Sequence, residues 1–217
     1  MLWMTLIGMK LKRNNFFKKM LKKFVIFKLV VFLFPFVLST AFSMEADIFV
    51  QSTVNRASET LSGNNSQEER IEELKKIALD TVDIRGIGFY SLGSHRKALT
   101  DEKKKEYSEV FKEYFLTSFS SRLAEYSNPV IEVNSKEKIS ENYTIVSSTL
   151  AATDKRPAVK IDWRIYTKNP EKPLIRDLII EGLSLARTQK EEFNSIIQSA
   201  DGDVEALFIN LKEFANR

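Results

Sequence analysis

The prolines divide the chain into two parts that fold under different constraints. No proline occurs between residue 44 and residue 128. The four that follow are Pro129, Pro157, Pro170 and Pro173. Because a proline inside a helix removes a backbone hydrogen bond and clashes with the preceding turn, only the first part can hold long uninterrupted helices. The sequence therefore predicts helices up to Asn128 and shorter elements separated by turns after it.

Two helices are predicted soon after residue 44. Apolar residues recur at helical spacing over residues 47–61, and Gly63 follows as a stop signal. Ser66 then stands where a helix N-cap is expected, and Glu69 completes a capping box. Both helices have one apolar side, which indicates that each packs against a core.

Two more helices are predicted before the first proline. Asp83 is predicted to be the N-cap of a short helix, and Gly93 its C-cap. Thr100 caps the longest helix, which extends to about Tyr126 and has a wider apolar face than contact with one neighbour requires. That face consists of Tyr107, Val110, Phe111, Tyr114, Phe115, Phe119, Leu123 and Tyr126.

Beyond Asn128 the apolar period changes from helical spacing to two, which predicts strands. Four strands are expected, over residues 130–134, 143–152, 158–166 and 174–181. One helix then starts near Leu183 and ends at about Gln198, and Asp203 caps a last helix. The predicted class is α+β: N-terminal helices, a coiled four-stranded antiparallel sheet and C-terminal helices, enclosing an apolar cavity.

The N-terminal segment has the three parts of a secretory signal peptide. Residues 1–43 contain eight basic residues and no acidic one, so the net charge of +4 becomes −4 over the remainder. An apolar stretch follows the basic run, and Ala41 and Ser43 occupy the positions that signal peptidase reads. We predict cleavage after Ser43, with Met20 as the true translation start. The basic charge belongs to this segment, so it does not indicate nucleic-acid binding.

The rest of the chain is predicted to be one domain that only packing stabilises. Residues 44–217 suffice for a single core. The sequence contains no cysteine, which excludes disulfides, cysteine-ligated metals and a lipoprotein anchor on cysteine. We expect no metal site and no cofactor.

A search for catalytic residues favours structural roles. His95 lies in a polar stretch that predicts a solvated loop, with no motif that supplies a triad. Asp177 and Glu181 are four residues apart, so a strand would place both carboxylates on one face, where acid–base chemistry is conceivable. We expect instead that Asp177 pairs with Arg164, and that Glu181 caps the helix near Leu183 or bonds to Ser184.

Residues of about 70–214 resemble the MlaC family of periplasmic phospholipid-binding proteins, also called the toluene-tolerance family. One stretch that carries the resemblance runs from Asp83 through Leu92-Gly93 into the aromatic helix. The more specific stretch is the strand Val-Lys-Ile-Asp-Trp-Arg-Ile at 159–165, followed by Glu-Gly-Leu-Ser-Leu at 181–185. The chain departs from the family pattern at residues 173–176 and at 188–190.

The resemblance implies a soluble carrier in the periplasm of a Gram-negative cell, not an enzyme. It implies that the carrier shuttles phospholipid between an outer-membrane lipoprotein complex and an inner-membrane ABC transporter with an MCE-domain subunit. Such a role concerns the lipid asymmetry of the outer membrane and needs no nucleic acid.

We predict that the lipid cavity lies between the aromatic helix and the sheet. The candidate lining residues are Tyr90, Phe111, Tyr114, Phe115, Phe119, Val146, Leu150, Ile161, Trp163, Ile165, Leu178, Ile180 and Leu183. The head group is expected at the mouth, because burying its phosphate would be costly. Two alternatives stay open: an enzyme acting on an apolar substrate in the same cavity, and a carrier of another hydrophobic compound such as a hopanoid or a fatty acid. A structural factor without a ligand would instead have a filled core.

Overall fold

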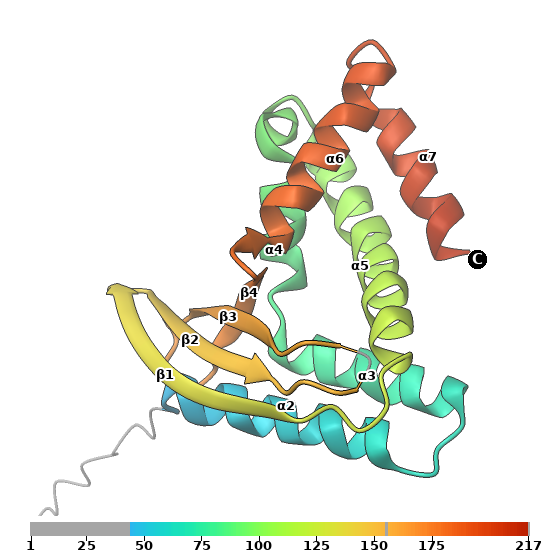
Figure 1. Ribbon diagram of the computed structural model, residues 1–217. Helices are drawn as coiled ribbons and strands as arrows, with labels where there is room; N and C mark the ends of the chain where they lie inside the picture. The colour runs from blue at the N-terminus through green and yellow to red at the C-terminus, as the bar shows by residue number, and fades with distance from the viewer. Residues whose placement is uncertain (1–43, 155, 217) are drawn as a thin grey trace, which may run out of the picture. The chain divides into compact units, whose positions relative to one another are not determined.

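The computed structural model describes residues 44–154 and 156–216, which run from helices through a sheet to helices again (Figure 1). These residues belong to one unit of the chain, Phe42–Arg217. The predicted signal segment, residues 1–43, lies outside the described residues. The predicted α+β class and its order of elements are confirmed.

Side-chain caps fix where most of the helices before the sheet begin. Within the described residues these helices are α2 (Ala46–Ser62), α3 (Gln67–Thr81), α4 (Ile84–Ser91), the 3-10 helix η1 (Gly93–Lys97) and α5 (Asp101–Ala124). Ser66, Asp83 and Thr100 each accept a hydrogen bond from a backbone N–H in the first turn of α3, α4 and α5. The predicted capping box of Ser66 and Glu69 is present.

The sheet is an open antiparallel meander in which each strand pairs with the next along the chain. Its strands are β1 (Ile131–Ser140), β2 (Tyr143–Leu150), β3 (Val159–Tyr166), β4 (Leu174–Ile180) and β5 (Leu183–Ser184). The expected four strands are therefore five. Glu181 and Gly182 both have positive φ, 49° and 83°, which is the conformation of a tight two-residue hairpin turn. This turn adds β5 to the edge of the sheet.

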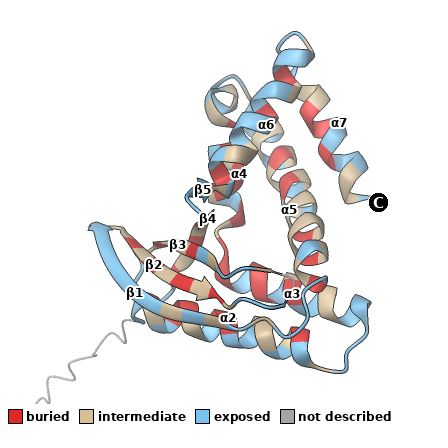
Figure 2. Cartoon of the chain, viewed as in Figure 1, coloured by how far each residue is buried: buried red, intermediate tan, exposed pale blue. Residues whose placement is uncertain are grey.

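Strand β1 is about twice as long as the sequence pattern predicts. Residues 134–140 are exposed along the outer strand of the sheet (Figure 2) and are polar except for Ile139, so no apolar alternation marks this part of the strand. Pairing with β2 holds it in the strand conformation. Lys136 also forms ion pairs with Glu45 and Asp47 at the start of α2, which ties the strand to that helix.

Helices cover one face of the sheet unevenly (Figure 1). Helix α2 contacts β1 and β2, whereas α4 and α6 (Leu185–Ser199) contact β4. The long helix α5 packs against α3, α4 and α7 (Val204–Ala215), and its contacts with the sheet are sparse. The sheet and α5 are therefore held mainly by the helices that lie between them.

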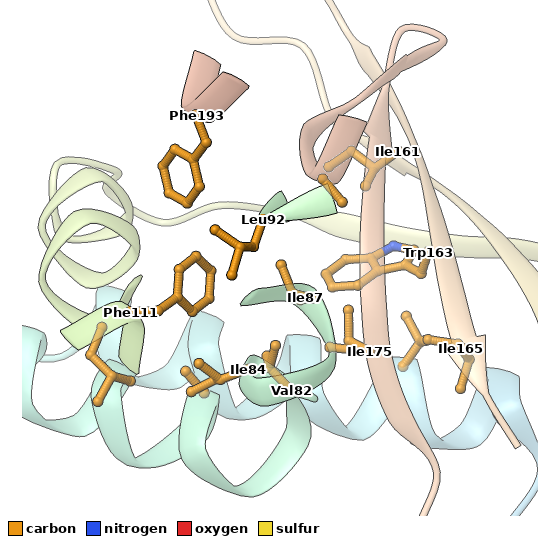
Figure 3. Close-up of a cluster of buried hydrophobic side chains, with 14 of the residues drawn as sticks. Val82, Ile84, Ile87, Leu92, Phe111, Ile161, Trp163, Ile165, Ile175 and Phe193 are labelled. Atoms are coloured by element: carbon orange, nitrogen blue, oxygen red, sulfur yellow. The ribbon is translucent and has the colours of Figure 1, made fainter. Parts of the chain in front are cut away.

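The N-terminal half of α5 is anchored by close contact with α4. Tyr107 and Phe111 are buried, and the Tyr107 hydroxyl donates a hydrogen bond to the Gly88 carbonyl at 2.9 Å. A Cβ atom at Gly88 would lie 2.7 Å from the Phe111 ring, so only glycine permits this approach. Figure 3 shows Phe111 beside Leu92, with Phe193 of α6 completing the cluster.

Asp83 joins the start of α4 to strand β4. Its Oδ1 accepts the Gly86 N–H at 2.8 Å, and its Oδ2 accepts from the Arg176 guanidinium at 2.6 Å. The Arg176 guanidinium also lies 3.9 Å from the Tyr166 ring centroid. One carboxylate thus caps a helix and neutralises a partly buried cation.

We expect Asp83→Ala to lower the free energy of unfolding by about 2–4 kcal/mol, because both a helix cap and a charged hydrogen bond are lost. Urea unfolding followed by circular dichroism measures this change. Asp80→Ala is the matched control: Asp80 pairs with Arg56 but has a side chain that is 58% exposed, so its loss should cost less than about 1 kcal/mol. Equal losses in the two variants would contradict the role given to Asp83.

Candidate ligand-binding pocket

A pocket of about 520 Å³ lies among α2, α3, α5, α6 and strands β2 to β4. Its volume falls within the range of about 300–1,000 Å³ that is usual for small-molecule sites. The wall is mostly apolar, and the pocket is partly open to solvent. Figure 3 shows part of the surroundings, where Ile161 and Trp163 of β3 face Ile87 of α4 and Phe111 of α5.

The pocket exists because the two halves of α5 have different neighbours. Its N-terminal half packs into the core through Tyr107 and Phe111. Farther along, Phe115 and Phe119 are only half-buried and line the pocket, with their rings stacked at 5.4 Å and 12°. They leave room between α5 and the sheet because the sheet does not pack closely against this half of the helix.

A group of polar residues lines the side of the pocket where α5 faces α6. The Tyr114 hydroxyl donates a hydrogen bond to Gln189 Oε1 at 3.0 Å, and Gln189 Nε2 donates to Glu192 at 3.0 Å. Burial raises the pKa of the Tyr114 hydroxyl, so the phenol stays neutral and remains a hydrogen-bond donor. Ser118 and Thr188 add hydroxyl groups to the same wall.

Nine of the thirteen residues that the sequence analysis predicts as cavity lining lie in the wall of this pocket. They are Phe111, Tyr114, Phe115, Phe119, Leu150, Ile161, Trp163, Leu178 and Ile180. The structure thus brings together the aromatic helix and the middle of the sheet. Contact of these residues with a lipid remains a prediction.

The other four predicted residues lie elsewhere. Val146 and Ile165 are fully buried within the core cluster, so they fill space instead of lining it. Tyr90 is 43% exposed and lies at a second, smaller pocket of about 300 Å³ beside Arg164 and Arg176. Leu183 is 59% exposed on the short strand β5.

A large part of the wall comes from α2 and α3 and was not predicted from the sequence. These residues include Val54, Ala57, Leu61, Leu74, Ile77 and Ala78. Their helical spacing was the available signal, and it predicts the apolar stripe of each helix. It does not predict which part of a stripe is covered by a neighbour and which part faces a hollow.

Asp177 lines the pocket, but its carboxylate is fully engaged in local bonding. Oδ2 accepts from the Ser184 hydroxyl at 2.6 Å, and Oδ1 accepts from the Ala186 N–H at 3.0 Å. Arg164, the predicted partner, lies 3.8 Å from Oδ2. Asp177 therefore fastens β4 to the start of α6, where Ser184 is the N-cap.

The remaining candidate residues for chemistry lie apart from the pocket wall. Glu181 accepts a hydrogen bond from the Lys160 backbone N–H. The expectation that Glu181 caps α6 or bonds to Ser184 is therefore wrong, because the Ser184 hydroxyl donates to Asp177. His95 lies in η1, not in a loop, and its Nε2 is 3.2 Å from Asn194 Oδ1.

Within residues 44–154 and 156–216, no group of three or more acidic, histidine or cysteine side chains could hold a metal ion. The described helices include none that is both long enough and apolar enough to span a membrane.

Comparison with known proteins finds a matching family model and solved structures of similar fold. The family model described as MlaC protein matches residues 51–213. A phospholipid-binding protein from Ralstonia solanacearum, solved in complex with a phospholipid, matches with a TM-score of 0.67 and 21% sequence identity. The match covers 80% of this chain and 98% of the other. No curated protein matches the chain by sequence.

The bonding of Asp177 predicts its effect on stability. Asp177→Ala should lower the free energy of unfolding by about 2–3 kcal/mol, because it leaves the Ser184 hydroxyl and the Ala186 N–H without their acceptor. Asp177→Asn, which keeps the shape and one acceptor, should cost less. Thermal unfolding of the three proteins gives the order. Removal of a side chain held ready for catalysis would instead leave stability unchanged or raise it, which would contradict the structural role.

Proposed function

The chain belongs to the MlaC family, and from this premise we propose that it is a carrier that binds a phospholipid and moves it between the two membranes of a Gram-negative envelope. The observation that carries the proposal is the apolar pocket of about 520 Å³ between α5 and the sheet. The Ralstonia solanacearum protein of similar fold supports the choice of ligand, because it was solved with a phospholipid bound.

The physical need for such a carrier follows from the hydrophobic effect. At about 0.8 kcal/mol per methylene, two chains of about fifteen methylenes oppose transfer into water by roughly 24 kcal/mol. The half-buried aromatic rings of Phe115 and Phe119, with Ile161 and Leu178 of the sheet, offer an apolar surface in place of water. The acyl chains occupy this surface, and the head group stays at the open side.

Transport of this kind requires no catalytic residue. A carrier loads and unloads according to the difference in lipid affinity between it and its partners. In this proposal the partners are an outer-membrane lipoprotein complex and an inner-membrane ABC transporter with an MCE-domain subunit. ATP hydrolysis by the transporter supplies the direction. The polar bonding of Asp177 fits a binding protein, because it stabilises the wall and engages both oxygens of this carboxylate.

We expect the purified protein to carry phospholipid, which native mass spectrometry with lipid extraction detects directly. Leu178→Asp should reduce the bound lipid to less than about a tenth, because a carboxylate facing the acyl chains must lose its water. Leu79→Asp is the matched control, since Leu79 is 50% exposed on α3 and does not line the pocket.

Circular dichroism of both variants separates lost binding from lost folding. A folded Leu178→Asp protein that carries as much lipid as the wild type would remove Leu178 from the lining. A wild-type protein that copurifies with no lipid and takes none from phospholipid vesicles would overturn the proposal. Extraction of a hopanoid or a fatty acid in place of phospholipid would keep the carrier and change its cargo.

The proposed site of action is the periplasm. Cells that express the full chain with a C-terminal tag should release it with the periplasmic fraction, and N-terminal sequencing should start at Met44. Deletion of residues 1–19 should leave export intact, because Met20 begins a complete signal. Leu33→Arg places a charge in the apolar stretch and should hold the protein in the cytoplasm. Recovery of the wild type in the membrane fraction with residues 20–43 attached would contradict cleavage and indicate an anchor.

A further inference from the structure

Charged side chains are few in the pocket wall. They are Arg122, Arg156, Asp177 and Glu192. The Asp177 carboxylate is occupied by Ser184 and Ala186. Glu192 lies on α6, where it accepts a hydrogen bond from Gln189. The two arginines are therefore the positive charges that this wall offers to a ligand.

Arg122 continues the pocket-lining face of α5. Phe115, Phe119 and Arg122 follow one another at steps of four and three residues, so they share one face of the helix, and Tyr126 follows just after the helix ends at Ala124. All four line the pocket. The apolar stack of Phe115 and Phe119 thus leads directly to a guanidinium near the C-terminal end of the helix, in the order that hydrocarbon chains and a charged head group follow in a phospholipid.

Arg156 lies in the connection between β2 and β3 and faces the same end of α5. Its guanidinium carbon is 5.1 Å from the centroid of the Tyr126 ring, a distance at which a cation is attracted to an aromatic face. Its Nε atom is buried and, among residues 44–154 and 156–216, has no hydrogen-bond partner. The terminal N–H groups of this guanidinium are the donors that it offers to a ligand oxygen.

Neither arginine forms an ion pair with an acidic side chain in the described part of the chain. Arg56, Arg164 and Arg176, by contrast, each lie within 4 Å of an aspartate. A guanidinium presents planar N–H groups that match phosphate oxygens, and it is the side chain best suited to that contact. Among the described residues Arg85 and Arg187 also form no ion pair with an acidic side chain, and what sets Arg122 and Arg156 apart is their place in the wall of the apolar pocket.

We propose that Arg122 and Arg156 form the head-group subsite of the pocket and bind the phosphodiester of the lipid. This inference rests on the proposed function, because it assigns the polar end of the same ligand. It predicts that the protein prefers lipids with a phosphate over lipids that have the same acyl chains without one.

The test reloads delipidated protein with an equimolar mixture of dioleoylphosphatidylglycerol and dioleoylglycerol, and native mass spectrometry gives the ratio of the two bound lipids. The wild type should favour phosphatidylglycerol. The double variant Arg122→Gln/Arg156→Gln should lower the ratio by about 10-fold to 100-fold, as expected for charged hydrogen bonds. Arg187→Gln is the control: Arg187 is exposed on α6 and does not line the pocket, and its replacement removes one of the two positive charges that the double variant loses.

The ratio is measured within each sample, so a fall in the amount of folded protein does not change it. An unchanged ratio in the double variant, or an equal fall in Arg187→Gln, would overturn the assignment. Inorganic phosphate at the same concentration as the lipids should leave the wild-type ratio unchanged, because no acyl chain holds a free anion in the pocket. A lower ratio with phosphate would mean that the arginines form a site for free anions and would also overturn it. If the proposed function itself is wrong, the wild type binds neither lipid, and this result distinguishes that failure from a wrong assignment of the two arginines.

Discussion

The contact between α4 and α5 at Gly88 is the constraint on which the rest of the pocket depends. The absence of a side chain at Gly88 lets the Phe111 ring approach the α4 backbone, and the Tyr107 hydroxyl closes the contact. This anchors one half of a 24-residue helix in the core. A helix is stiff, so the other half must continue in the same direction, and it passes the sheet without packing closely on it. The hollow is thus a consequence of where α5 is fixed.

Two aspartates keep the opposite wall in place. Asp83 connects the start of α4 to β4 through Arg176, and Asp177 connects β4 to the start of α6. A wall that faces a hollow receives less support from packing than a wall inside a filled core, because its side chains lack neighbours on one side. Directional hydrogen bonds of the adjacent residues Arg176 and Asp177 in the middle of β4 supply part of the missing support, which explains why a carboxylate is buried beside an apolar pocket.

The parts of the fold that could be predicted from sequence are those with local causes. Ser66, Asp83 and Thr100 cap helices through bonds to residues three positions away, so the sequence pattern predicts them. The second half of β1 could not be predicted, because Lys136 is held by Glu45 and Asp47 at the other end of the domain's sequence. The same limit applies to the site. Val146 and Leu150 alternate on one face of β2, yet only Leu150 reaches the pocket. Which of the two residues lines the pocket depends on how helices that are distant in the sequence pack over the sheet.

A carrier must release what it binds, and the observed pocket is consistent with that demand. A sealed cavity that removed every methylene from water would hold a lipid as firmly as a membrane does, and transfer would then require the domain to open. The pocket here is partly open to solvent, and its aromatic wall of Phe115 and Phe119 is only half-buried. Part of the acyl surface would therefore stay within reach of a partner. Under the proposed function, an incomplete enclosure keeps the affinity for lipid below the level at which unloading would become slow.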